Sequence, residues 1–509
     1  MRNILESLHR SKLLAPRALF HLAGSFLAEG TNLVALVRFS ARLHPGRIAL
    51  REGPSEITIE ELHRRSLRMA CLLRDDHGVV PDCKVALACR NHIDSVVCLF
   101  SLSRLGAHVD LLNVEQSPEQ LAHLIMRRKF DLILHDSDLS SKFPGRIPSH
   151  RFLDVAEISS RATKRTNRDA RLPRHRSGRI TVLTGGTAGT PKPAGRQPSI
   201  FGAALPMLAL LGALRLDRCR SMYIATPIYH GYGLAFMVLA IFLRKETSLT
   251  RRYRTADALS MIQAHAIESA ILVPLMLGRM MAMDPTSLAS LRCIVSGGAI
   301  LPEPLARGVI ECLGDVLYNL YGTSEAGFSV IATPECLRRN PSTLGRPLRG
   351  VSLRIQDDAG QFLPNGSAGT IHIRSGWSTK PDGDGWISTG DIGYLDSLGS
   401  LFLSGRADRM IVSGGENVFP EDVEQILTQH ADIQSCACLG IPDSEFGQRL
   451  IALVEPRPNH PLTEASLLPW LSSRAARYQM PVRVEIVDAL PMTSVGKVDY
   501  KAVRSMVTE

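Results

Sequence analysis

The chain has few aromatic residues and lacks any long apolar run. Phenylalanine, tryptophan and tyrosine together make up 5% of its 509 residues. A nucleic-acid site usually combines basic side chains with aromatic platforms or a recognisable motif, and neither is found, so the net charge of +10 does not indicate nucleic-acid binding. A membrane-spanning helix needs about 18 consecutive apolar residues, and such a run is missing.

Paired cysteines are missing as well. The ten cysteines are scattered, none stands in a Cys-x-x-Cys pair, and no histidine cluster lies beside them. This pattern excludes a disulfide-rich secreted domain and a zinc site of the usual spacing. We therefore predict reduced thiols in a cytoplasmic protein.

The segment from Met1 to Leu27 leaves two interpretations open. Arg2, Arg10 and Lys12 precede apolar residues, but Pro16 interrupts the pattern. A signal-peptide core with a cleavage site is not recognisable. We expect either a helix packed on its own domain or an amphipathic helix in peripheral contact with the inner face of a membrane.

A Walker A loop is also absent, because Gly496-Lys497 is followed by Val498. Glycines and hydroxyls gather instead directly after the β-branched segment from Ile180 to Leu183, in the run TGGTAGTPK that ends at Lys192. Glycine allows close backbone approach, while threonine hydroxyls and a lysine bind anionic oxygens. The run predicts a loop over a phosphate chain, with a flexible Gly/Thr turn as the alternative.

Strand and helix patterns alternate along the first two thirds of the chain. Strand patterns at 222–225, 291–295 and 316–318 each lead into a glycine-containing loop, as does the strand before the Gly/Thr run. In parallel α/β sheets ligands bind beyond the carboxyl ends of the strands, so these four loops are expected to converge on one site.

Short β pieces separated by Gly, Pro and Asp replace this pattern from about residue 340, and a further α+β pattern follows residue 409. We predict an α/β fold with a large N-terminal domain of layered α/β subdomains, residues 1–405, that includes a small β-barrel-like subdomain. A hinge at 406–409 and a small mobile α+β C-terminal domain at 410–509 complete the expected organisation.

Seven motifs in order give the chain a resemblance to the adenylate-forming superfamily of acyl-CoA synthetases, peptide-synthetase adenylation domains and luciferases. They are TGGTAGTPKP, PIYHGYG, VSGGAILP, YGTSE, WISTGDIG, LSGRADRMIVSGGENVFPEDVE and PMTSVGKVD. The resemblance implies an acid–thiol ligase that joins a carboxylate to AMP from ATP with Mg²⁺ and then transfers the acyl group to CoA or to a carrier-protein phosphopantetheine. Two anions must meet in the first step, so cations are needed at the α-phosphate.

The resemblance also implies a role for individual residues. The phosphate loop corresponds to Thr184, Gly185, Gly186, Thr187, Gly189 and Lys192. The nucleotide face corresponds to Gly297, Gly298, Ala299, Asn319, Tyr321, Gly322 and Thr323, with Tyr321 stacking on adenine. Asp391 and Arg406 are implied to hold the ribose, Ser324 the α-phosphate and Glu325 the Mg²⁺ ion.

The resemblance further implies a C-terminal domain that swings. Lys497 is implied to bridge the carboxylate and the α-phosphate during adenylation, and Asp408 to be the hinge. After the swing, Ser413, Gly414 and Gly415 would approach the site and let the pantetheine arm pass.

The acid is expected to have an apolar tail. His230 is implied to gate the acyl pocket, and no acidic residue that could pair with an α-ammonium occurs from Gly231 to Leu243. We therefore predict a medium- or long-chain fatty acid and a role in lipid metabolism, with an aryl acid as one alternative. Loading of a carrier protein is a second alternative, and a non-catalytic nucleotide- or nucleic-acid-binding protein a third.

Three positions depart from the family pattern. Gly185 replaces a serine, Pro193 replaces a glycine, and Arg409 stands where an acid often follows the hinge. These changes bear on rate and thiol acceptor rather than on adenylation itself.

Overall fold

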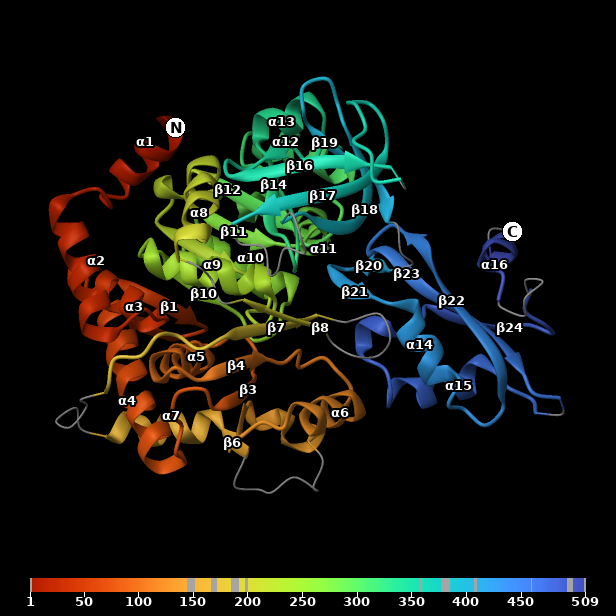
Figure 1. Ribbon diagram of the computed structural model, residues 1–509, viewed down its shortest axis with the longest axis horizontal. Helices are drawn as coiled ribbons and strands as arrows, with labels where there is room; N and C mark the ends of the chain where they lie inside the picture. Colours follow the sequence, from red (N-terminus) through yellow and green to blue (C-terminus); the bar gives the residue numbers. More distant parts are fainter. Residues whose placement is uncertain are drawn as a thin grey trace.

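The structure is a computed structural model that describes residues 2–143, 152–165, 172–184, 192–196, 200–357, 359–376, 385–406, 410–458, 460–491 and 498–507. Two large sheets with helices packed on them form most of the molecule, and a smaller β-rich domain lies to one side (Figure 1). Among the residues that the structure describes, no helix is long and apolar enough to cross a lipid bilayer.

The first large sheet has nine strands and is parallel through its centre. In spatial order its strands are β15 (Arg346–Pro347), β14 (Gly327–Ala332), β13 (Leu317–Thr323), β12 (Cys293–Gly297), β11 (Ser269–Leu272), β9 (Ser221–Ile224), β10 (Glu246–Leu249), β1 (Ile48–Glu52) and β2 (Ser55–Thr58). The strands from β1 to β13 in this order run parallel, and β2, β14 and β15 pair antiparallel at the two edges. The carboxyl ends of four buried strands, β9, β11, β12 and β13, therefore meet at one edge.

The second large sheet has six strands. Their order is β6 (Phe152–Asp154), β5 (Leu132–His135), β3 (Lys84–Ala88), β4 (His108–Leu111), β7 (Ile180–Thr184) and β8 (Lys192–Arg196). All pairs are parallel except β7 with β8, where Thr184 stands opposite Lys192.

The remaining two sheets are smaller. The antiparallel strands β16 (Val351–Gln356), β17 (Gly369–Ser375), β18 (Ile387–Leu395) and β19 (Leu401–Arg406) form the subdomain predicted to be barrel-like. The C-terminal sheet contains β21 (Glu416–Val418), β20 (Ile411–Ser413), β23 (Gly447–Pro456), β22 (Ile433–Asp443) and β24 (Arg483–Ile486). The chain passes from β19 into β20 across the predicted hinge.

Helices cover the sheets in the order expected for repeated βα units. In the large domain they are α1 (Arg2–Arg10), α2 (Pro16–Glu29), α3 (Leu33–Leu43), α4 (Ile59–His77), α5 (Ile93–Leu105), α6 (Pro118–Arg128), α7 (Val155–Lys164), α8 (Ile200–Leu214), α9 (Gly231–Phe242), α10 (Thr255–Ala264), α11 (Pro274–Met283), α12 (Glu303–Leu313) and α13 (Pro334–Arg339). The C-terminal domain adds α14 (Pro420–Leu427), α15 (Glu464–Ser472) and α16 (Tyr500–Val507).

Local sequence signals explain several helix boundaries. Thr58 ends β2 because its side chain accepts a hydrogen bond from the Glu61 amide and caps α4. Ser117 caps α6 reciprocally with Gln120.

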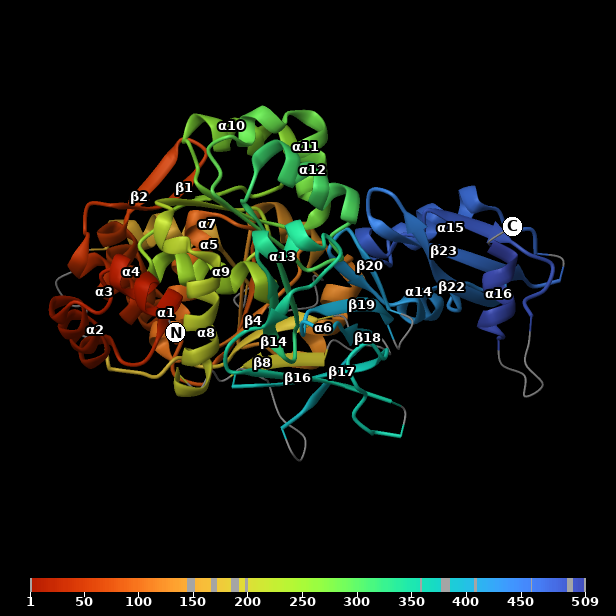
Figure 2. The ribbon, with the colours of Figure 1, turned by 90° about the horizontal axis from the view of Figure 1, so that it is seen from above.

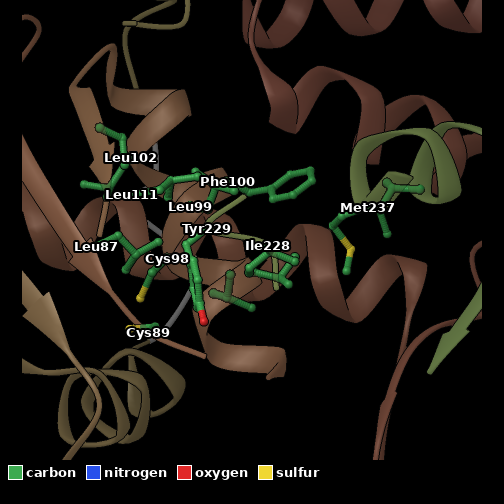
Figure 3. Packing of buried hydrophobic residues seen from close by; sticks show 14 of the residues in the cluster. Leu87, Cys89, Cys98, Leu99, Phe100, Leu102, Leu111, Ile228, Tyr229 and Met237 are labelled. Carbon is green, nitrogen blue, oxygen red and sulfur yellow. The ribbon is translucent and has the colours of Figure 1, made fainter. Parts of the chain in front are cut away.

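One apolar core joins the two large sheets. Figure 3 shows Leu87 of β3 and Phe100 of α5 near Ile228 and Tyr229, which belong to the loop between β9 and α9. All of these side chains are buried. The loop that carries His230 thus packs on both sheets, and this packing makes it a rigid support for a site.

Candidate active site

A cleft of ≈ 2720 Å³ opens between the large domain and the C-terminal domain, at the carboxyl ends of β9, β11, β12 and β13. Most of the predicted site residues whose side chains are described line it: His230, Gly298, Ala299, Asn319, Tyr321, Gly322, Thr323, Ser324, Glu325, Asp391, Ser413, Gly414 and Gly415. The four loops predicted to converge do so as far as they are described.

The glycine turn after β12 lies close to its neighbours. A Cβ atom on Gly297 would lie 2.9 Å from the Leu320 carbonyl oxygen, closer than side-chain contacts allow, and 3.2 Å from Cζ of Tyr232, which is a tight contact. Gly298 follows with φ +81°, in the left-handed region that glycine tolerates best. Gly297 therefore packs where a side chain would not fit, and Gly298 after it brings exposed backbone to the cleft wall.

Tyr321 and Asp391 connect the large sheet to the four-stranded sheet. The Tyr321 hydroxyl donates a hydrogen bond of 2.6 Å to Oδ2 of Asp391. Asp391 is buried, and it stands directly opposite Arg406 in the pairing of β18 with β19. The two residues implied to hold a ribose are thus neighbours across one ladder, although only the backbone of Arg406 is described.

Ser324 and Glu325 occupy the turn between β13 and β14. The Thr323 hydroxyl accepts a hydrogen bond of 3.1 Å from the Ala326 amide and so holds this turn in place. Glu325 is exposed at the cleft, where a carboxylate is a suitable hard oxygen ligand for Mg²⁺. The residue types present therefore fit a magnesium ion at this turn.

His230 forms an ion pair with Glu416 of β21 across the cleft, with 3.0 Å between Nε2 and Oε1. Burial disfavours the charged form of both groups, but their attraction and hydrogen bond outweigh it. The pKa of His230 is consequently raised above its usual value, and the pKa of Glu416 is lowered. This pair links the predicted acyl-pocket gate to the C-terminal domain.

The turn between β20 and β21 packs directly on the large domain. Gly414 has φ +58° and a Cβ there would lie 3.0 Å from Leu275, while a Cβ on Gly415, with φ +91°, would lie 3.0 Å from Cγ1 of Val273. Arg279 adds an ion pair of 2.5 Å with Glu445. The glycine-containing turn predicted to approach the site is therefore already seated in it.

Several predicted site residues cannot be placed. Gly185, Gly186, Thr187, Gly189, Asp408 and Lys497 lie outside the described residues. Of Thr184 and Lys192 only the strand pairing is described, and it closes the two ends of the phosphate loop against each other. Helix α16, which follows the lysine motif, lies at the end of the C-terminal domain remote from β20 (Figures 1 and 2).

Two residues in the cleft were missed as site residues from the sequence: Glu416, described above, and Tyr232. The Tyr232 hydroxyl donates a hydrogen bond of 2.9 Å to the Val295 carbonyl oxygen. Its ring meets Phe236 and Phe328 edge to face, at 5.4 and 6.0 Å between centroids. The motif PIYHGYG contains this tyrosine, but only the fold places it behind Gly297.

One cluster of metal-ligand types is found among the described residues, at Cys89, His92 and Asp136. His92 donates from Nε2 to Asp136 at 2.6 Å and accepts at Nδ1 from the Ser95 amide, and the Arg90 amide donates to Asp136. Burial raises the pKa of the Cys89 thiol well above its usual value, which keeps it protonated. These groups satisfy one another and fix the start of α5.

Comparison with known proteins agrees with this geometry. The sequence profile of the family described as AMP-binding enzyme matches residues 37–380, and the profile of the AMP-binding enzyme C-terminal domain matches residues 422–497. The chain therefore belongs to the adenylate-forming superfamily, in its branch of acyl- and aryl-CoA ligases. The predictions of the fold class and of an AMP-forming acid–thiol ligase that uses ATP, Mg²⁺ and CoA are confirmed at the level of this family.

Relatives within the family activate aromatic acids. A 2-succinylbenzoate–CoA ligase of Geobacillus sp. (strain WCH70) is 29% identical over 478 residues, covering 90% of this chain and 94% of the relative. An indoleacetate–CoA ligase of Aromatoleum aromaticum is 29% identical over 501 residues, covering 92% and 96%. These relatives support acyl-CoA ligase activity in general, and they favour the aryl-acid alternative over the fatty acid and the lipid-metabolism role that we predicted.

The o-succinylbenzoate CoA synthetase of Bacillus subtilis offers two structures for comparison. Its complex with a product analogue, OSB-NCoA, has a TM-score of 0.82 at 25% identity, covering 92% of this chain and 98% of that one. Its complex with the acyl-adenylate intermediate OSB-AMP has a TM-score of 0.66 at 26% identity, covering 93% and 98%. The present structure thus resembles the first of these states more than the second.

Proposed function

We propose that the protein is an ATP-dependent CoA ligase for an aromatic carboxylic acid. The observation that carries this proposal is the aromatic wall of the cleft beside the Gly297 turn, where Tyr232 and Phe328 line the cleft and Phe236 is buried behind them. Their edge-to-face contacts and the Tyr232 hydrogen bond hold the wall rigid. A flat ring fits against the Tyr232 and Phe328 rings beside the exposed backbone of Gly298, whereas a long flexible chain has no ring to stack on them.

The cleft residues suit the two reactions that such a ligase performs. In the first, a carboxylate oxygen attacks the α-phosphate of ATP, the bond from that phosphorus to the bridging oxygen breaks, and pyrophosphate leaves. Mg²⁺ bound at Glu325 would offset phosphate charge, and the Ser324 hydroxyl, which lines the same cleft, would donate to the α-phosphate. Tyr321 and the Asp391 that it orients would hold the adenosine.

Lys497 and Asp408 keep the roles proposed from the sequence, as the adenylation lysine and the hinge. In the second reaction a thiolate sulfur attacks the acyl carbon and AMP leaves. The seated turn at Gly414 and Gly415 and the greater similarity to the product-analogue complex support assignment of the present domain arrangement to this step. CoA is the proposed acceptor, and carrier-protein loading is the competing one.

His230 is proposed to exchange its contacts when the C-terminal domain swings between the two reactions. Its imidazole reaches Glu416 only while β21 lies in the cleft, since the two residues belong to different domains. The pair would hold the imidazole aside when the thiol enters and release it when the domain swings away.

The experiment that tests the proposal measures CoA-dependent AMP formation with a panel of aryl, arylacetic and fatty acids. The expected result is preference for an aromatic acid. Tyr232→Ala should open the wall and raise the relative kcat/KM for longer acids, while Met126→Ala, an exposed change on α6, should leave the preference unchanged. Preference of the unaltered enzyme for fatty acids would refute the proposal.

A further inference from the structure

Exposed apolar side chains gather in the first two helices and in the connection between them. Fifteen large apolar side chains are strongly exposed among the described residues, and five of them lie close together in the sequence: Leu5, Leu14, Leu19, Phe20 and Leu27. Phe20 is 75% exposed and Leu27 is 68% exposed. Single exposed apolar residues are ordinary, but a concentration of this kind marks an interaction surface.

The exposed residues of α2 share one face. At 3.6 residues per turn, Leu19, Phe20, Ala23, Gly24 and Leu27 fall within an arc of roughly 140°. The residues buried beneath the helix, Ala18, Ser25 and Glu29, lie on the opposite side. A helix on the surface of a water-soluble domain normally presents polar residues outward, so this face lacks the composition that water favours.

The two helices are held firmly, so the face is presented to the outside rather than left on a loose segment. Helix α1 packs so closely on α8 that a Cβ on Gly212 would lie 2.9 Å from Ile4. The Arg244 guanidinium donates a hydrogen bond of 2.6 Å to the Ser11 carbonyl oxygen.

Ion pairs of Glu29 hold the C-terminal end of α2 in place. Arg38 and Arg104 bind its carboxylate at 2.9 and 2.8 Å, and His63 lies 3.3 Å away. Figures 1 and 2 show α2 at the edge of the molecule opposite the C-terminal domain, so a large partner there would not obstruct the cleft.

Positive charge flanks the apolar face at the start of α2. Lys12 and Arg17 are exposed there, Arg10 pairs with Glu6 and Asp217 at 4.0 and 3.7 Å, and the acid of α2, Glu29, is buried and neutralised by its cationic partners. The pKa of nearby His44 is lowered by burial and by the positive charges of Arg244, Arg47, Lys12 and Arg17, which indicates a locally positive potential.

We propose that this α1–α2 surface, made of Leu5, Leu14, Leu19, Phe20 and Leu27 with the cations Lys12 and Arg17, binds the surface of an anionic lipid bilayer. Apolar side chains enter the boundary between headgroups and acyl chains, while the flanking cations meet lipid phosphates. A symmetric dimer through the same face fits less well, because a two-fold axis would place the cations of one copy beside those of the other. The proposal does not depend on which acid the cleft accepts.

Flotation of the full-length protein with lipid vesicles tests this. Vesicles of phosphatidylcholine alone are compared with vesicles containing roughly one third phosphatidylglycerol, at low and high salt. We expect binding to the anionic vesicles, weakened by salt. Leu19→Ser/Phe20→Ser/Leu27→Ser and Lys12→Glu/Arg17→Glu should each lower binding at least about tenfold. Met126→Ser/Met283→Ser, which removes equally exposed apolar groups elsewhere, should not.

Each other outcome overturns the proposal. Failure of the unaltered protein to bind anionic vesicles would do so, as would equal binding by the triple serine variant. If sedimentation instead revealed a dimer of the unaltered protein that the triple serine variant dissociates, a second copy of the chain would be the occupant. Because Lys12, Arg17, Leu19, Phe20 and Leu27 are exposed and lie on or next to α2, at the edge of the molecule opposite the C-terminal domain, ligase activity with a soluble acid should stay unchanged in their variants and reports that these variants are folded.

Discussion

Replacing Gly415 by alanine should slow thioester formation while leaving adenylation nearly intact. A Cβ at this position would lie 3.0 Å from Cγ1 of Val273, a few tenths of an ångström inside ordinary contact. Overpacking of this kind costs about 1–3 kcal/mol. Because the overlap exists only while the turn between β20 and β21 is seated on the large domain, the seated arrangement should become about 5- to 150-fold less populated.

Two half-reactions separate the effects. Exchange of labelled pyrophosphate into ATP reports adenylation, and single-turnover transfer from preformed acyl-adenylate to CoA reports the second step. Gly399→Ala is a matched control, because Gly399 also has a left-handed φ, +74°, but no described atom lies within 4 Å of its Cβ position. The control should lose some stability from the strained backbone and keep both rates.

A double variant tests the contact itself. Val273→Ala removes the methyl group that the new Cβ meets, so Gly415→Ala/Val273→Ala should recover part of the lost transfer rate relative to Val273→Ala alone. If Gly415→Ala lowers the rates of both half-reactions equally, or if Val273→Ala restores none of the lost transfer rate, then packing of the turn against Val273 does not control thioester formation.

Three further outcomes are expected. In Glu416→Gln the pKa of His230 should fall, because the carboxylate that raises it is gone. In the parent the ion pair is fully formed below the ordinary histidine pKa and is lost as pH rises through the raised value, so NMR titration of His230 should give a lower pKa in the variant than in the parent, and an unchanged pKa would contradict the pairing. Tyr321→Phe removes a hydrogen bond to the Asp391 carboxylate and should raise the KM for ATP about tenfold without changing the KM for the acid, which steady-state kinetics checks. Glu29→Gln should lower the free energy of unfolding by ~3 kcal/mol at neutral pH, because the pKa of Glu29 is lowered from 4.5 to about 2. This contribution to stability is present above pH 4.5 and is lost as pH falls towards 2. Urea unfolding curves of the variant and the parent should therefore converge in acid.

The sequence was sufficient for the large features of the fold. Apolar strand patterns followed by glycine-containing loops predicted that β9, β12 and β13 would end at one cleft, and the pairing in the nine-stranded sheet agrees. This works because parallel strands with short connections leave their carboxyl ends on one edge. The domain boundaries and the hinge stay predictions, since the proposed hinge residue Asp408 is not described.

Contacts between distant segments could not be predicted in the same way. Nothing in the local pattern around His230 indicates that Glu416, far along the chain, would meet it, because the contact depends on how two domains dock. The wall behind Gly297 likewise needs Tyr232 and Phe328 from separate elements to meet. The fatty-acid prediction arose from this limit, since apolar composition alone does not distinguish an aromatic slot from a long channel.

The most direct test of the account is a competition. The enzyme is given ATP, Mg²⁺, CoA and an equimolar mixture of aromatic and straight-chain fatty acids, and the CoA thioesters formed are identified by mass spectrometry while AMP is measured in parallel. The account predicts that an aromatic acyl-CoA dominates and that one AMP is released for each thioester. A predominance of fatty acyl-CoA, or thioester formation without AMP, would contradict it.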